Sequence, residues 1–233
     1  MSPVSALAIV ALAALIHASF QLSVSVLTVL SGHAIGAKKP TPKVLRLTSS
    51  FVAGAGVMTV LLLSTIALLV LHIFGGDTPL IVWAVACGLM IGAGVAVWAF
   101  YYRHQKGTTL WIPRAVARYL SDRTKATDQA AEAFALGMMS VIGELLFIFA
   151  PLLISALVLV QLSGFWQIIG IIMYAVLSLL TLLSVWVSIG SGHKLSEIQR
   201  WREANKHFLQ FAAGAGLIIL GIFTYVYEIL GRI

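Results

Sequence analysis

Six long apolar runs dominate this chain and leave little sequence between them. They cover about residues 4–30, 47–74, 79–102, 133–160, 165–190 and 208–230. Each run is long enough to cross a hydrocarbon core of ~30 Å as a helix. A helix satisfies all of its backbone hydrogen bonds internally, which lipid requires. The sequence therefore predicts an all-α polytopic membrane protein with six transmembrane helices.

The composition leaves no room for a separate soluble domain. Hydrophobic residues make up 60% of the 233 residues and charged residues only 10%. Residues 6–16 could pass for the apolar core of a signal peptide. However, no basic segment precedes them and the apolar run continues to Leu30, so we expect the first spanning helix here. We predict a single transmembrane domain over residues 1–233.

The basic residues are confined to alternate connections. Of fifteen Lys and Arg residues, all but Arg232 fall within Lys38–Arg46, Arg103–Lys125 and Lys194–Lys206. By the positive-inside rule these loops are cytoplasmic, which places both termini outside the cytoplasmic (inner) membrane. Orientation and anionic lipid headgroups thus explain the net charge of +7, and we expect no nucleic-acid partner.

Three helices, a long cytoplasmic loop and three more helices make an odd-numbered repeat. The halves, about residues 1–108 and 127–233, must then face opposite ways, as 3+3 inverted repeats do in many transporters. Within the linking loop, residues 110–120 alternate apolar side chains with Arg114 and Arg118. This pattern predicts a short helix on the cytoplasmic membrane surface, and a solvated amphipathic linker is the alternative.

Glycines cluster inside three of the predicted helices. The motif Phe-x-Ala-Gly-Ala-Gly occurs at residues 51–56 and again at 211–216, and Gly88, Gly92 and Gly94 lie in the third helix. Small residues at this spacing allow helices to approach closely in lipid. A phosphate cradle is not indicated, because a nucleotide fingerprint follows a strand.

Glu144 is the only acidic or basic residue deep inside any apolar run. A charge there costs about 2.5–3.5 kcal/mol on insertion scales, so it usually serves a pathway or a coupling site. Burial favours the protonated carboxyl, which suits coupling to a proton or a cation. The alternative is a structural carboxyl hydrogen-bonded to Gln21 or His17. Seven residues later, Pro151 removes a backbone donor and predicts a break in the helix near Phe147.

A narrow polar stripe runs along the first helix of each predicted half. In the first half it consists of His17, Gln21, Ser25 and Thr28, within an arc of about 80°. In the second half it consists of Ser140, Glu144, Pro151 and Ser155. The fifth helix has a further stripe of Tyr174, Ser178, Thr181 and Ser188.

The two stripes on the first and fourth helices predict a mid-membrane substrate or coupling site. Its candidate residues are Glu144, Gln21, His17, Ser25, Thr28, Ser140 and Pro151. Hydrogen bonding between helices is the alternative explanation for His17 and Gln21.

The order of these features resembles the lysine-exporter superfamily, which also contains the thiol-relay proteins of cytochrome c maturation. Residues 134–137 (Phe-Ala-Leu-Gly) leading to 150–152 (Ala-Pro-Leu) are similar to the fourth helix of that clan. The end of the chain, from Arg200-Trp201-Arg202 through Phe211 to residues 216–221, is similar to its last helix. The resemblance implies a 3+3 inverted bundle with a central pathway between the first and fourth helices.

The chain departs from that family in its cysteines, and this bears on which of the family's functions it can have. The thiol-relay members carry one cysteine in each of the first and fourth helices, and this chain has none in either. Ile148 stands near the position expected for the second cysteine, and the single cysteine, Cys87, lies in the third helix. The missing cysteines therefore argue against thiol–disulfide transfer, whereas export remains open.

Metal binding and catalysis find little support in the sequence. His33 and His193 each follow a Ser-Gly pair at a cytoplasmic helix end and are weak candidates for metal ligands. No His-x3-His pair or carboxylate cluster accompanies them. No paired carboxylates or Ser–His arrangement share a common depth, so we expect neither an enzyme nor a cofactor.

Two functions are compatible with this sequence. The first is an inner-membrane transporter that exports a small solute or ion through the site between the first and fourth helices. The second is a non-transporting scaffold that binds a partner through its basic cytoplasmic loops. The lipid bilayer is a partner in either case, and a homo-oligomer remains open.

Overall fold

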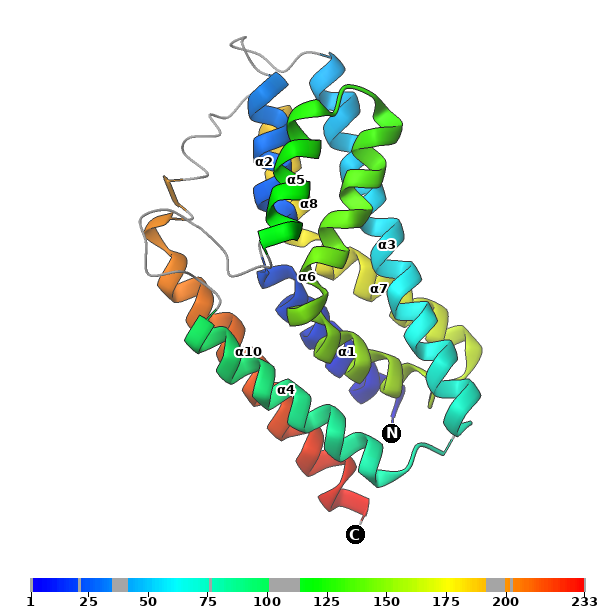
Figure 1. The fold of residues 1–233 in the computed structure, drawn as a ribbon. Helices are drawn as coiled ribbons and strands as arrows, with labels where there is room; N and C mark the ends of the chain where they lie inside the picture. Colours follow the sequence, from blue (N-terminus) through cyan, green and yellow to red (C-terminus); the bar gives the residue numbers. More distant parts are fainter. Residues whose placement is uncertain are drawn as a thin grey trace.

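The computed structural model describes residues 2–20, 22–34, 42–75, 77–100, 114–191, 200–201 and 203–232, and in these ranges the chain forms helices joined by short turns, with no strands. The elements are α1 (Pro3–Ser19), α2 (Leu22–Ala34), α3 (Pro42–Phe74), α4 (Leu80–Phe100), α5 (Arg114–Ala126), α6 (Ala130–Leu159), α7 (Gly164–Ser178), α8 (Leu180–Gly190), α10 (Lys206–Glu228) and the 3-10 turn η1 (Leu230–Arg232). The prediction of an all-α chain is confirmed for these residues. Both termini lie at the same end of the helical assembly (Figure 1).

Four helices, α3, α4, α6 and α10, are each long and apolar enough to cross a membrane. Two bent pairs, α1 with α2 and α7 with α8, pass the same test when each pair is taken together. The described residues therefore contain four to six candidate spans. Large apolar side chains cover the outside of these helices; Leu68, Ile81 and Phe165 are 65%, 69% and 68% exposed. An apolar exterior of this extent fits a protein surrounded by lipid.

The two bent pairs correct the prediction of continuous helices over residues 4–30 and 165–190. The first bends by 47° after Ser19 and the second by 52° at Leu179. At each break the preceding serine donates to a carbonyl oxygen three residues earlier: Ser19 to Ile16 at 2.6 Å and Ser178 to Ala175 at 3.1 Å. Hydroxyls bonded in this way compete with the backbone ladder and bend helices.

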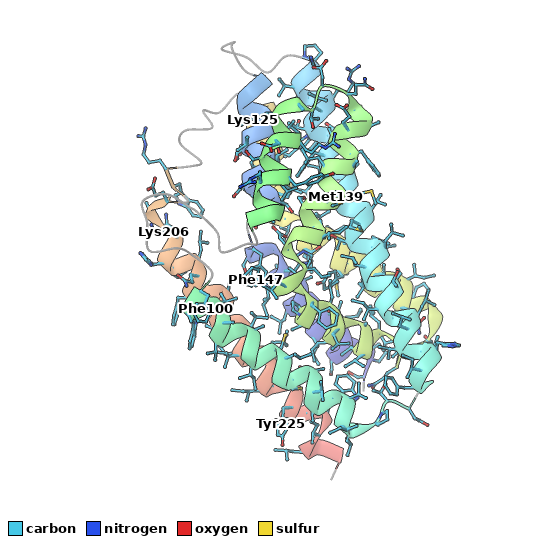
Figure 2. The ribbon with its side chains drawn as sticks, viewed as in Figure 1. Phe100, Lys125, Met139, Phe147, Lys206 and Tyr225 are labelled. Atoms are coloured by element: carbon cyan, nitrogen blue, oxygen red, sulfur yellow. The ribbon has the colours of Figure 1, made fainter. Side chains whose placement is uncertain are left out.

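The predicted break at Pro151 is wrong, because α6 continues through it to Leu159. Pro151 is buried, and its carbonyl oxygen accepts the Ser155 hydroxyl at 2.8 Å. The missing Pro151 N–H takes one helical donor away from the Phe147 carbonyl, and membrane helices tolerate proline at this cost without ending. Phe147, labelled near the centre of Figure 2, stacks on Phe20 with ring centroids 5.7 Å apart.

A backbone contact joins α3 and α6 at two glycines. A Cβ atom on Gly54 would lie 2.0 Å from the Phe134 carbonyl oxygen, and one on Gly137 would lie 2.0 Å from that of Phe51. Only glycine fits at either position, so each helix presses its backbone into the gap left by the other. This contact holds α6 in register against α3.

The helices α4 and α10 form a second close pair, side by side in Figure 1. A Cβ atom on Gly94 would lie 2.8 Å from the Gly214 carbonyl oxygen, and one on Gly214 would lie 2.9 Å from that of Gly94. Gly88 and Gly92 are exposed instead, with nothing within 4 Å of an added Cβ. Of the three glycines predicted to form a packing face, only Gly94 makes the contact.

The helix predicted at residues 110–120 is found over Arg114–Ala126, while 110–113 lie outside the described residues. It packs against α2 and α6 and buries Leu120 and Thr124. In Figure 1 it runs beside α6 at the end of the assembly opposite the termini. The described part of the linker, Arg114–Ala126, therefore packs into the bundle.

Candidate functional site

The break between α1 and α2 faces the middle of α6. Glu144 is only 4% exposed, and its Oε1 accepts the backbone N–H of Ser23 at 2.7 Å. Ser23 lies in the first turn of α2, where N–H groups have no partner within the helix and carry a partial positive charge. The carboxylate of α6 thus caps a half-helix that begins inside the bundle.

Ser140 reinforces this contact one turn earlier on α6. Its hydroxyl lies 3.0 Å from the Ser23 hydroxyl and 2.7 Å from the Gly137 carbonyl oxygen. Glu144 and Ser140 therefore hold the main chain and the side chain of the same residue, which fixes the first turn of α2 against α6.

The second break, at Leu179, lies against the first. The Thr181 hydroxyl donates to the Ala18 carbonyl oxygen at 2.6 Å, and the Phe20 N–H donates to the His17 carbonyl oxygen at 3.0 Å. Carbonyls at the end of α1 lack helical partners, so these donors supply bonds that the bend would otherwise remove. A side chain of the second bent pair thus satisfies a backbone carbonyl at the break of the first.

A buried polar pair lies beside the breaks. His17 is 5% exposed and Tyr174 fully buried, and the His17 Nδ1 lies 3.1 Å from the Tyr174 hydroxyl oxygen. Their rings are tilted, with centroids 5.7 Å apart. This pair connects α1 to α7 just before both helices end.

A small cavity lies where these elements meet, and we call it the Glu144 cavity. Its volume, measured as the space that the centre of a water molecule can occupy, is about 20 Å³, which holds roughly one water molecule. Its polar lining comes from both bent pairs, α3 and α6: His17, Ser23, Thr59, Glu144, Ser178 and Thr181. The cavity offers a carboxylate, an imidazole and several hydroxyls to a very small ligand.

Only some of the predicted site residues meet here. His17 and Glu144 line the Glu144 cavity, and Ser140 contacts its wall through Ser23. Ser25, Thr28 and Pro151 do not line it. The Thr28 hydroxyl donates within α2 to the Ser25 carbonyl oxygen at 2.8 Å.

Three other candidates cannot be placed in the site. Gln21 and His193 lie outside the described residues, and so does the side chain of His33. Among the described residues, no group of three or more His, Cys, Asp or Glu side chains could hold a metal ion.

Sequence reasoning missed part of the cavity. The polar stripe of the fifth predicted helix contains Ser178, Thr181 and Tyr174, but nothing connected it to Glu144. Ser23 and Thr59 carried no signal, because an isolated hydroxyl in an apolar run usually bonds to its own helix. Their role depends on where the helices bend.

A larger groove of about 260 Å³ lies between α5 and the first turns of α6. Met139, labelled in Figure 2, lines it together with Tyr119, Arg123 and Glu132. Arg123 lies over the Tyr119 ring at 5.7 Å, and Glu132 accepts the backbone N–H of Asp128 at 2.9 Å. These charged groups are exposed and already have partners within the chain.

Comparison with protein-family models, with curated proteins and with solved structures finds no match. The function must therefore be argued from the geometry of the chain itself.

Proposed function

We propose that this chain is an inner-membrane transporter that exports a small solute or ion past the Glu144 cavity, with Glu144 as its proton-coupling residue. The observation that carries the proposal is the 2.7 Å hydrogen bond from the Ser23 N–H to the Glu144 carboxylate at a helix break. Interrupted helices whose ends face a buried site are a recurrent feature of transporters. At membrane depth, irregular backbone is tolerated where protein surrounds it or where it lines a cavity.

The coupling step follows from the chemistry of that hydrogen bond. A charge-assisted bond to a carboxylate is about twice as strong as a neutral one, so protonation of Glu144 weakens its hold on α2. The bend at Phe20 then acts as a hinge between α1 and α2. Proton binding on one side of the membrane and release on the other would alternate the angle of this hinge.

The packing pattern supports inverted halves. Exchanging the halves pairs α1 and α2 with α6, α3 with α7 and α8, and α4 with α10. If the halves are related in this way, the contact between α3 and α6 should have a counterpart between the bent pair α7 and α8 and the bent pair α1 and α2. The contact between α4 and α6 should likewise have a counterpart between α10 and α1. All of these contacts occur. With the basic loops in the cytoplasm, both termini lie outside.

The test uses purified protein in liposomes that contain a pH-sensitive dye. A panel of amino acids, metal ions and monovalent salts is applied, and the solute that drives proton flux identifies the substrate. We expect Glu144→Gln to abolish this flux. The matched control is Glu228→Gln, because Glu144 and Glu228 are the two buried carboxyls among the described residues. Proton flux that is unchanged in Glu144→Gln contradicts the coupling role.

One observation favours the scaffold as a second candidate. In the most apolar stretch of 18 residues within α6, 67% of the residues are buried. The Glu144 cavity beside it has room for about one water molecule. A helix packed this tightly is also suited to a fixed role. The scaffold predicts that charge reversal at Arg114, Arg118, Arg200 and Arg202 prevents co-purification of a partner, whereas Glu144→Gln does not. It further predicts no flux with any solute of the panel.

A further inference from the structure

The hydroxyl groups of the Glu144 cavity indicate which class of ligand it takes. Thr59 and Ser178 donate to carbonyl oxygens one turn earlier in their own helices, at 2.9 and 3.1 Å. Thr181 donates across the breaks to Ala18 at 2.6 Å. A hydroxyl has one proton, so each of these oxygens has only its lone pairs left to offer. In this arrangement these three lining hydroxyls present lone pairs to the cavity, which can accept hydrogen bonds or coordinate a cation.

The charge balance points the same way. The N-terminus of α2 contributes a partial positive charge, and the C-terminus of α1 at the same break contributes a partial negative one. The two largely cancel, and among the described lining residues the Glu144 carboxylate is then the group that carries a negative charge. An anion would face this carboxylate together with acceptor oxygens. A divalent ion such as Ca²⁺ usually has several carboxylates among its six to eight oxygen ligands, whereas the described residues that line the cavity include one carboxylate, Glu144.

We propose that the Glu144 cavity binds one dehydrated monovalent cation no larger than a water molecule, such as Na⁺ or K⁺. The Glu144 carboxylate balances its charge, and the hydroxyl oxygens of Thr59, Ser178 and Thr181 replace its hydration shell. In the conformation of this structure, the volume of about 20 Å³ fits one such ion and is too small for an organic solute. This inference rests on the proposed function, because it assigns the ligand of the same site.

Protons compete with the cation for the carboxylate. The other titratable side chain that lines the cavity is His17 from α1, which is hydrogen-bonded to Tyr174 from α7. The described lining residues of α2, α3 and α8 include no titratable group. Lowering the pH is therefore expected to weaken cation binding through Glu144. Exchange of a proton for a cation at one carboxylate would couple the two fluxes.

The test measures thermal unfolding of the full chain in dodecyl maltoside. Cys87 is the only cysteine and is 1% exposed, so a maleimide dye that fluoresces on reaction with it reports unfolding. NaCl and KCl are titrated against choline chloride at constant ionic strength. We expect a saturable rise in the midpoint with at least one of the two salts, roughly 3–6 °C at ten times Kd. Glu144→Gln should abolish this rise.

A matched pair of variants locates the site. Thr59 and Thr48 are both buried on α3, and each donates to its own helix at 2.9 Å, but only Thr59 lines the cavity. Thr59→Val should weaken the cation effect at least tenfold, whereas Thr48→Val should leave it unchanged.

Three outcomes overturn the cation proposal. The first is no saturable rise in the unfolding midpoint with either salt. The second is an equal rise in Glu144→Gln and in the unmodified chain. The third is an equal loss of the cation effect in Thr59→Val and Thr48→Val. If the variants do not fold, the wild-type chain still decides, because a shift that does not shrink as the pH is lowered contradicts binding at Glu144. If a cation raises the unfolding midpoint but no transport is detected, the proposed transport function is refuted and the cation-binding site is supported. If Glu144→Gln abolishes proton flux but no cation raises the unfolding midpoint, the transport function is supported and the cation-binding site is refuted.

Discussion

The close contact between α3 and α6 makes Gly137→Ala the sharpest structural test. The added Cβ would lie 2.0 Å from the Phe51 carbonyl oxygen, 2.9 Å from its carbon and 3.0 Å from the Ala55 nitrogen. All three are backbone atoms of a continuous helix, so no side-chain rotation relieves the clash. Gly137 lies seven residues, or about two turns, before Glu144 on the same helix. A shift of α6 here would displace the carboxylate as well.

The size of the effect follows from that geometry. Carbon and carbonyl oxygen approach to about 3.3 Å in helix–helix contacts, so the backbones must separate locally by about 1.3 Å. A gap of 0.5–1 Å already loses about a quarter to a half of the dispersion energy of the atoms facing it. Inserting a methyl into a packed core typically costs about 1–3 kcal/mol. For a chain of this length we expect the midpoint to fall by roughly 2–12 °C.

The assay is thermal unfolding reported by Cys87, with Gly92→Ala as the control. An added Cβ at Gly92 meets nothing within 4 Å, and alanine favours the helix over glycine by about 0.5–1 kcal/mol. The same substitution should therefore lower the midpoint at Gly137 and maintain or raise it at Gly92. An unchanged midpoint for Gly137→Ala, or an equal loss for both variants, would refute the packing argument.

Three further predictions concern the breaks and the orientation of the chain. Thr181→Val leaves the Ala18 carbonyl without this donor, at a cost of about 1–3 kcal/mol. Hydrogen exchange should accelerate at the first break and stay unchanged in Ser184→Ala, whose hydroxyl donates only to its own helix. Tyr174→Phe removes the hydroxyl bonded to His17 and should destabilise the chain by a similar amount, seen as a lower unfolding midpoint. Alkaline phosphatase fused to the C-terminus should be active and green fluorescent protein dark, whereas the opposite result contradicts the orientation.

The helix positions were predictable because membrane thickness sets the required length of an apolar run. The predicted segments 47–74, 79–102 and 208–230 correspond to Pro42–Phe74, Leu80–Phe100 and Lys206–Glu228. Lipid allows few alternatives to a helix over such lengths. The prediction that Glu144 is buried within a helix is likewise confirmed.

The breaks were not predictable by the same reasoning. Proline is the usual sequence signal for an interrupted helix, and here it was misleading, since α6 passes Pro151 without interruption. The actual bends follow Ser19 and occur at Leu179, where local hydroxyl bonds and contacts between distant helices decide the geometry. A hydroxyl that bends one helix is indistinguishable in sequence from one that leaves another straight. Thr59, for example, makes the same type of bond inside the continuous α3.

The position of the breaks also bears on how an inverted repeat could work. Exchange of the halves pairs the bent α1 and α2 with the continuous α6, and the bent α7 and α8 with the continuous α3. Each of these halves thus has one bent span and two continuous spans, and each bent span packs against a continuous span of the other half. In the proposed mechanism, a proton, a cation and the Ser23 N–H all act on the carboxylate of Glu144. Because ligands that act on one group are thermodynamically linked, occupancy of the cavity must alter the hold on α2. In that mechanism, a carboxylate on a continuous span of one proposed half would set the angle of the bent span in the other.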